Sequence, residues 1–282
     1  MRFTTRRAAA AVAALTLVLT ACGDDGGTTD DTGAEPTNGG ADADGEAAAD
    51  LELINEGTLS VCSDIPYPPF EFEDADAPSG YSGFDIDLMQ ETADRLGLEL
   101  EVLEVGFDGL QSGATLAAGQ CDIAASAMTI TEERQQNLNF SEPYYDSLQS
   151  LIVLADSDVQ SLEDVAGQAL GVQQGTTGAE YAQENAPEGT EIVEFGSGPD
   201  LFTAMQAGQI VAGLQDLPVN VEQVNNDPSF EIVEEYDTGE QYGFAAAQGN
   251  DSLIEAVNEQ LAAMRDDGTY DEIYDRYFAV EE

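Results

Sequence analysis

The chain has 282 residues, and its 57 acidic residues against seven basic ones give a formal net charge of −50. It contains no histidine, which excludes Ser-His-Asp and Cys-His catalysis and any metal site that uses histidine. So large a negative charge disfavours nucleic acids and anionic surfaces as partners. The glycine-containing turns match neither the P-loop nor the dinucleotide-binding fingerprint. We therefore predict no nucleic-acid partner, no metal and no cofactor.

Residues 1–21 have the pattern of a signal peptide, with three arginines followed by an apolar run at 8–20. This run is too short to cross a bilayer, which takes about 20 residues. It ends in the sequence LTAC, which resembles the lipobox of bacterial lipoproteins and implies cleavage before Cys22 and acylation of that residue. Ordinary secretion with a chance cysteine is the alternative.

Residues 22–50 are predicted to form a disordered tether after the acylated cysteine. Beyond Cys22 the segment has no apolar residue larger than alanine, so it cannot bury enough surface to offset the entropy of its chain. A lipid anchor and a flexible tether predict a monomeric body held at the outer face of the cell membrane, on its extracellular or periplasmic side.

The body, residues 51–282, contains 48 of the acids and four of the arginines. Such acidity suggests a salt-rich habitat in which counterions screen the repulsion, and an acid-rich lineage without high salt is the alternative. Outside the cell, the pair Cys62 and Cys121 predicts a disulfide, although each also lies beside a strand pattern where a buried thiol fits.

Short apolar segments alternate with helical patterns along the body. In chain order the predicted elements are a strand at 59–64, a helix at 83–97, a strand at 98–105, a helix at 107–119, a strand at 121–128, a helix at 131–137, a strand at 148–155, a helix at 161–167, a strand at 168–174, a helix at 175–185, a strand at 191–195, a helix at 199–208, a strand at 209–216, a helix at 217–226, strands at 230–235 and 242–248, and helices at 251–268 and 269–278. The alternation predicts an α/β fold of mostly parallel sheets flanked by helices.

Five segments of the body resemble segments of a known protein family and occur in the same order along the chain. They are SDIPYPPFEF (63–72), GYSGFDIDLMQETADRLG (80–97), GQCDIAASAMTITEERQQNLNFSEPYY (119–145), GVQQGTTG (171–178) and DGTYDEIYDRYF (267–278). Together they resemble the substrate-binding proteins of bacterial ABC importers for polar amino acids. The resemblance implies a two-lobed type II periplasmic-binding fold with two crossing hinge strands. Lobe 1 would comprise residues 51–147 and 242–282, and lobe 2 residues 148–241.

The resemblance also implies a clamp for the backbone of an amino acid. Arg134 matches the arginine that grips the α-carboxylate, and a guanidinium suits a planar carboxylate because it donates two parallel hydrogen bonds. Thr129 matches a donor to the same carboxylate, and Thr176 and Thr177 match a turn whose amides complete the cradle. Asp216 matches the carboxylate that holds the α-ammonium group of the ligand. The alternative for Arg134 is a surface arginine that pairs with neighbouring glutamates.

The remaining matches concern the side chain of the ligand. Tyr67 and Phe107 match two aromatic residues that sandwich it, with ordinary core packing as the alternative. Asp64 and Ser126 match positions that face its distal polar group. Gln173 stands where some members have lysine. The chain departs from the family in two ways: it carries two extra residues between Phe107 and Leu116, and Ala127 offers only its backbone.

The ligand class follows from the few cations near the expected site. A dicarboxylate ligand needs a second cation, but Arg95, Arg265 and Arg276 fall in predicted helices away from the cleft. Acidic amino acids are therefore disfavoured, and Asp64 favours a basic or an amide side chain. A hydrophobic or modified amino acid is the alternative. We predict a receptor that delivers such an amino acid to an ABC permease, and not an enzyme. The rival is a dehydratase or lyase of the same fold that uses carboxylates in the cleft.

Overall fold

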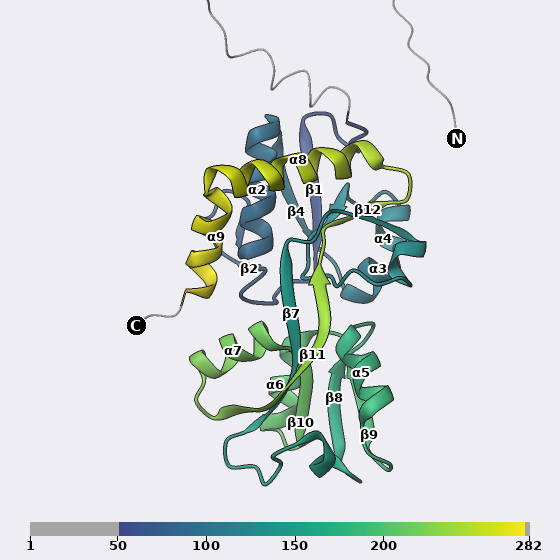
Figure 1. The fold of residues 1–282 in the computed structure, drawn as a ribbon, viewed down its shortest axis with the longest axis vertical. Helices are drawn as coiled ribbons and strands as arrows, with labels where there is room; N and C mark the ends of the chain where they lie inside the picture. The colour runs from purple at the N-terminus through teal and green to yellow at the C-terminus, as the bar shows by residue number, and fades with distance from the viewer. Residues whose placement is uncertain (1–50, 280–282) are drawn as a thin grey trace, which may run out of the picture. The chain divides into compact units, whose positions relative to one another are not determined.

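A computed structural model describes residues 51–279, so the predicted signal peptide, Cys22 and the tether lie outside the described residues. Within this range the chain forms two five-stranded sheets, each flanked by helices (Figure 1). One sheet is built from the first and last parts of the body, and the other from the middle. We refer to the two halves as lobe 1 and lobe 2.

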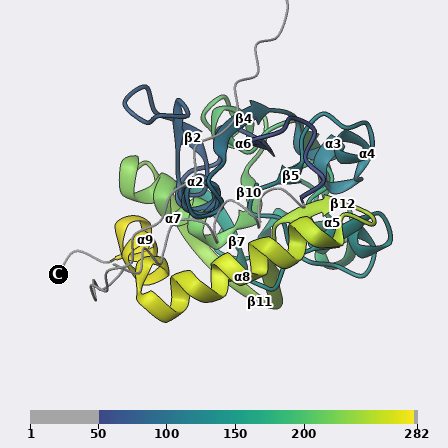
Figure 2. The same cartoon turned by 90° about the horizontal axis from the view of Figure 1, so that it is seen from above.

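Lobe 1 contains the sheet with the strand order β4-β1-β5-β12-β6. Its elements are β1 (Thr58–Ser63), β2 (Phe72–Glu73), β3 (Tyr81–Ser82), α2 (Phe84–Leu96), β4 (Glu99–Glu104), α3 (Phe107–Gln111), α4 (Ala114–Ala117), β5 (Ile123–Ala124), η1 (Arg134–Gln136), β6 (Leu138–Phe140), β12 (Ala245–Ala247), α8 (Asp251–Asp267) and α9 (Thr269–Phe278). The buried faces of α2 and α8 supply much of its apolar core. Figure 2 shows α8 as a long helix that is followed directly by α9.

Lobe 2 contains the sheet with the strand order β11-β7-β10-β8-β9. Its elements are β7 (Tyr145–Leu154), η2 (Leu162–Val165), β8 (Ala169–Gln173), α5 (Thr177–Asn185), β9 (Glu191–Phe195), α6 (Gly198–Gln206), β10 (Ala212–Asp216), α7 (Leu217–Asn226) and β11 (Phe230–Tyr242). Two apolar clusters lie in this lobe, one involving η2 and α5 and the other involving α6.

The strands β7 and β11 run between the lobes as an antiparallel pair (Figure 1). Their lobe 1 ends, Tyr145 and Tyr242, pack into the lobe 1 core, whereas Leu154 and Phe230 pair at the far side of lobe 2. These are the two crossing strands of the expected fold, and they carry the chain out of lobe 1 and back. We retain residues 51–147 with 242–282, and 148–241, as the proposed lobe boundaries.

The sheets are mixed and not mostly parallel as the alternation predicted. Each has two parallel and two antiparallel strand pairs. The reason lies in the connections. A strand that enters from the other lobe is not preceded by a crossover helix on the same sheet, so it is free to pair antiparallel.

Three predicted elements next to the cleft are shorter in the structure. The strand predicted at 121–128 is reduced to β5, because Ala127 adopts a left-handed φ of 44° that breaks the extended run. The helix predicted at 107–119 is divided where Gly113 adopts a φ of 77°. The helix predicted at 131–137 is the short turn η1, because Leu138 already pairs with β12.

Cys62 at the end of β1 and Cys121 before β5 form a disulfide in the structure. Both residues are buried in an apolar cluster of lobe 1. The bond ties the loop that precedes the pocket-lining segment 126–129 to the neighbouring strand. No helix between residues 51 and 279 is both long and apolar enough to cross a membrane.

We predict that replacing both Cys62 and Cys121 by serine lowers the free energy of unfolding. The cysteines are 59 residues apart, and closing a loop of that length in the unfolded chain corresponds to roughly 4 kcal/mol in the chain-entropy treatment. Urea unfolding of the double variant and of the oxidised protein measures the difference. Equal unfolding midpoints for the two proteins, at equal slopes, would contradict a disulfide in the native protein.

Candidate functional site

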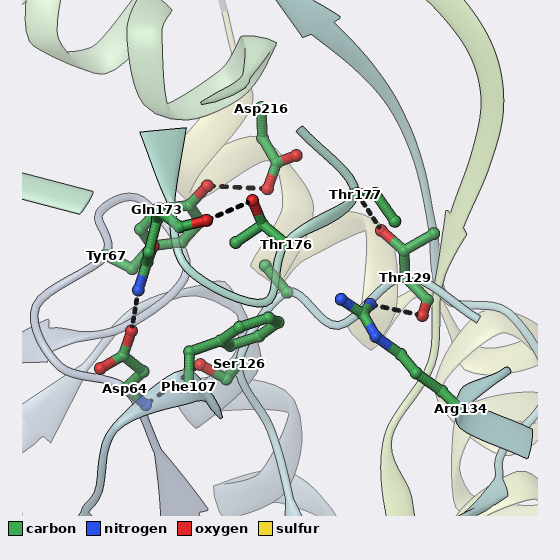
Figure 3. Close-up of a pocket in the computed structure, with 11 residues that line it drawn as sticks. Asp64, Tyr67, Phe107, Ser126, Thr129, Arg134, Gln173, Thr176, Thr177 and Asp216 are labelled. Carbon is green, nitrogen blue, oxygen red and sulfur yellow. Dashed lines mark hydrogen bonds between the residues drawn. The ribbon is translucent and has the colours of Figure 1, made fainter. Parts of the chain in front are cut away.

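A pocket lies between the lobes, with about 300 Å³ of space that no atom fills, part of it open to solvent. The residues that line it come from both lobes (Figure 3). They are Asp64, Tyr67, Phe107, Ser126, Ala127, Thr129, Arg134, Gln173, Thr176, Thr177 and Asp216. All eleven residues predicted for ligand binding therefore meet at one place.

The strands position these residues at their carboxyl ends. Asp64 directly follows β1, Gln173 ends β8 and Asp216 ends β10, while the segment 126–129 follows β5. In open α/β sheets this edge is where ligands bind. Thr176 caps the first turn of α5, since its side chain accepts a hydrogen bond from the backbone N–H of Ala179 at 3.1 Å.

Arg134 is buried, with only 5% of its surface exposed, and it forms no ion pair within residues 51–279. Its guanidinium donates to the carbonyl oxygen of Thr129 at 2.8 Å and to that of Gly175 at 2.9 Å. The same group lies 5.2 Å from the centre of the Phe107 ring. Burial lowers the pKa of Arg134, and nearby acids oppose this effect. The guanidinium has five N–H donors, so these two bonds leave others for an anion in the pocket.

Direct contacts between side chains join the lobes across the pocket. The Tyr67 hydroxyl of lobe 1 donates to Asp216 Oδ2 of lobe 2 at 2.7 Å. The amide of Gln173 in lobe 2 donates to Asp64 Oδ2 in lobe 1 at 2.6 Å (Figure 3). Gly198 permits the approach of Tyr67, because a Cβ atom there would lie 2.9 Å from the ring. The structure therefore has the lobes closed upon each other.

Two carboxyl groups of the pocket have raised pKa values. Burial raises the pKa of Asp64 to about 6, although the hydrogen bond from Gln173 opposes the shift. Burial and the negative charge of Glu240 raise the pKa of Asp216 to about 7, against the hydrogen bond from Tyr67. A cation placed between them would stabilise both carboxylates, because an opposite charge favours the ionised form.

Four residues that surround the site were not identified from the sequence. Glu240 and Gln149, on the crossing strands, bond to side chains of the pocket. Glu71 and Asp85 lie directly behind it, bonded to Ser126 and to the backbone of Ala127. With 48 acids in the body, spacing alone could not single out three of them. Only the bend of β11 brings Glu240 to the site.

Glu71 and Asp85 form a buried carboxyl pair, fully shielded from solvent. Ser126 Oγ donates to Glu71 Oε1 at 2.6 Å, and the N–H of Ala127 donates to Asp85 Oδ2 at 2.8 Å. Glu71 Oε2 and Asp85 Oδ1 have no hydrogen-bond partner. Burial and the charge of Asp85 raise the pKa of Glu71 well above its ordinary value, and burial raises the pKa of Asp85 to about 7. Ionising both carboxyl groups at once would cost a large free energy, because the two negative charges would be close together and shielded from water.

We predict that Glu71→Gln makes the stability of the protein less sensitive to pH. Because the folded pKa values of this pair are raised, the folded state holds protons that the unfolded chain releases, so stability falls as pH rises from about 4.5. Each pKa unit corresponds to about 1.4 kcal/mol. The amide of glutamine resembles the protonated carboxyl and cannot ionise, so the variant should gain stability relative to the native protein towards pH 8.

The measurement is denaturant unfolding between pH 5 and pH 8. Glu73→Gln, two residues away and exposed, is the matched control for the loss of one negative charge. A Glu71→Gln variant whose stability is lower than that of the native protein by the same amount at every pH would contradict the prediction.

Comparison with known proteins places these features in a family. Residues 59–280 match the family described as bacterial extracellular solute-binding proteins, family 3. The histidine-binding periplasmic protein of Escherichia coli K12 is 32% identical over 232 residues, which cover 78% of this chain and 87% of that protein. ABC transporter arginine-binding protein 1 of the same organism is 32% identical over 237 residues, covering 82% and 93%. Both are named as binding proteins and not as enzymes, in agreement with the prediction for this chain.

Solved structures resemble the fold closely. An ancestral arginine-binding protein is 36% identical in its arginine-bound structure, with a TM-score of 0.73 and coverage of 79% of this chain and 99% of that chain. Its glutamine-bound structure is 35% identical, with a TM-score of 0.74 and coverage of 80% and 100%. An ancestral amino acid-binding protein described as a precursor of cyclohexadienyl dehydratase is 35% identical, with a TM-score of 0.71 and coverage of 79% and 96%. The chain has the type II periplasmic-binding fold of these structures and belongs to the bacterial extracellular solute-binding proteins, family 3.

Proposed function

We propose that this protein is an extracellular receptor that binds a polar amino acid between its lobes and delivers it to an ABC permease. The observation that carries the proposal is the buried Arg134, which forms no ion pair with any residue between 51 and 279, on one side of a pocket that holds Asp216 on the other. A free amino acid presents a carboxylate and an ammonium group a short distance apart. The two side chains offer one complementary charge to each.

The relatives support this reading. Proteins named for histidine and arginine binding match most of the body, and one ancestral arginine-binding protein was solved with arginine and also with glutamine. For this chain we propose the same broad class, a basic or amide amino acid. The Asp64 carboxylate accepts hydrogen bonds from either kind of side chain and attracts a cation in addition.

An acidic ligand fits poorly for an electrostatic reason. Its second carboxylate would lie near Asp64, and among the residues that the structure describes Arg134 is the only basic one that lines the pocket. The other arginines of the described chain lie elsewhere. Arg95 pairs with Glu91 and Asp267, Arg276 pairs with Asp87, and Arg265 bonds to a backbone carbonyl.

The site of action follows from the N-terminal pattern together with the family. We propose that Cys22 is acylated and that residues 23–50 tether the body to the outer face of the cell membrane. One acyl chain alone binds a membrane only marginally, so a stable anchor requires more than one. The body is proposed to act as a monomer with the permease as its partner.

We predict that one basic or amide amino acid raises the melting temperature of the protein and that Arg134→Ala abolishes the rise. A ligand present at a hundred times its dissociation constant adds about 2.7 kcal/mol of stability. A thermal-shift screen against the common amino acids measures the effect, with Arg276→Ala as control because Arg276 is 59% exposed and absent from the pocket. If the ligand raises the melting temperature of Arg134→Ala as much as that of the native protein, Arg134 does not bind the ligand carboxylate. A ligand chemically altered after incubation would favour the lyase alternative.

We predict that the preference for arginine over glutamine increases with pH. The pKa of Asp64 is about 6, so the carboxyl group is mostly protonated at pH 5 and mostly ionised at pH 7. Only the ionised form attracts a cationic side chain, and its population rises about tenfold over this range. The ratio of the two affinities isolates Asp64, because Asp216 faces the same α-ammonium in both ligands.

Calorimetric titration with L-arginine and L-glutamine at pH 5, 6 and 7 measures this ratio. It should become independent of pH in Asp64→Asn and keep its slope in Asp94→Asn, which removes an exposed acid in α2. A ratio that is constant with pH in the native protein would mean that Asp64 does not face the side chain of the ligand.

A further inference from the structure

Glu240 lies near the lobe 1 end of the crossing strand β11. Its side chain reaches the seam between the lobes, by which we mean the place where Thr129 of lobe 1 meets Thr177 of lobe 2. Its Oε2 atom accepts a hydrogen bond from Thr129 Oγ1 of lobe 1 at 2.8 Å. The same atom accepts one from Thr177 Oγ1 of lobe 2, also at 2.8 Å. A single carboxylate oxygen therefore holds one hydroxyl from each lobe.

A β-bulge directs Glu240 to this place. Tyr236 pairs with Gln149 of β7 and Glu240 pairs with Ser147, so β11 has two more residues than β7 between these pairs. Gly239 adopts a left-handed φ of 69°, which is suited to glycine. Bulges bend a strand and redirect its side chains. Thr238 Oγ1 then donates to Glu240 Oε1 at 2.8 Å, which fixes the second oxygen of the carboxylate.

The other crossing strand completes the connection. The Gln149 amide of β7 donates to Glu240 Oε2 at 3.2 Å and to Asp216 Oδ1 at 2.5 Å. Asp216 in turn accepts from Tyr67 of lobe 1. A chain of hydrogen bonds thus runs from lobe 1 through both crossing strands and lobe 2, and returns to lobe 1. Glu240 and Gln149 are buried, with 8% and 0% of their surfaces exposed.

We propose that Glu240 is a positioning residue that couples the crossing strands to closure of the lobes by holding Thr129 and Thr177 together. The coupling serves the amino-acid site and in this respect rests on the proposed function. Each threonine hydroxyl has one hydrogen to donate, and both are directed to Glu240. When the lobes separate, at least one of these charge-assisted bonds must break, so Glu240 stabilises the closed form specifically.

Hydrogen exchange measured by mass spectrometry on the full-length chain, without added ligand, tests this coupling. In Glu240→Gln, the amides in segments 127–131 and 175–180 should exchange about tenfold faster, the loss expected when a charged acceptor is replaced by a neutral one. Segments in α2 and α8, away from the seam, should keep their native rates. Glu235→Gln, which removes an exposed acid of the same strand, should match the native protein.

Two outcomes would overturn the proposal. One is unchanged exchange at the seam in Glu240→Gln, and the other is an equal increase in every segment, which indicates general destabilisation. A second experiment uses L-arginine as the probe and follows its release by stopped flow. L-arginine should dissociate from Glu240→Gln about tenfold faster than from the native protein, at a similar association rate. If the native protein binds no basic or amide amino acid, the proposed function fails, whereas the exchange arm still decides the role of Glu240.

Discussion

A guanidinium buried between two lobes is costly unless its charge is compensated. Arg134 has two backbone carbonyls and an aromatic ring around it, but no carboxylate within the distance of an ion pair in the described part of the chain. In a protein with 57 acidic residues, such isolation requires acids to be kept away from one position. Arg134 holds the carbonyl of Gly175 from the other lobe, and it is the cation that the proposed carboxylate ligand requires.

The acids nearest the site show how the rest of the structure accommodates that constraint. Asp216 and Asp64 each accept a hydrogen bond from the opposite lobe, and Glu240 accepts one from both. These bonds form only when the lobes meet. The acids therefore join the two halves of the pocket, whereas acids elsewhere act within one lobe, as Glu91 and Asp267 do when they pair with Arg95. Position in the fold, and not the number of acids, decides which of them matter.

The sequence allowed the fold class and the eleven pocket residues to be predicted, because the resemblance spans the body and three of its five segments contain nine of these residues. The other two, Phe107 and Asp216, were matched by their places between those segments. What it could not predict depends on contacts between distant parts. Ala127 breaks a predicted strand by its left-handed backbone, and Gly113 divides a predicted helix. Glu240 resembled any other acid in an acid-rich strand, since the bulge that redirects it is defined by its register against β7.

The same register explains why binding and closure belong to one equilibrium. The crossing strands pair with each other along most of lobe 2, but they end in the aromatic core of lobe 1 through Tyr145 and Tyr242. Any rotation of the lobes must therefore change the strands near those ends, which is where Glu240 and Gln149 contact the pocket. A ligand stabilises the closed form only to the extent that it binds that form more tightly than the open one. The amino acid that we propose to bind between Arg134 and Asp216 would satisfy this condition, because the two residues come from different lobes.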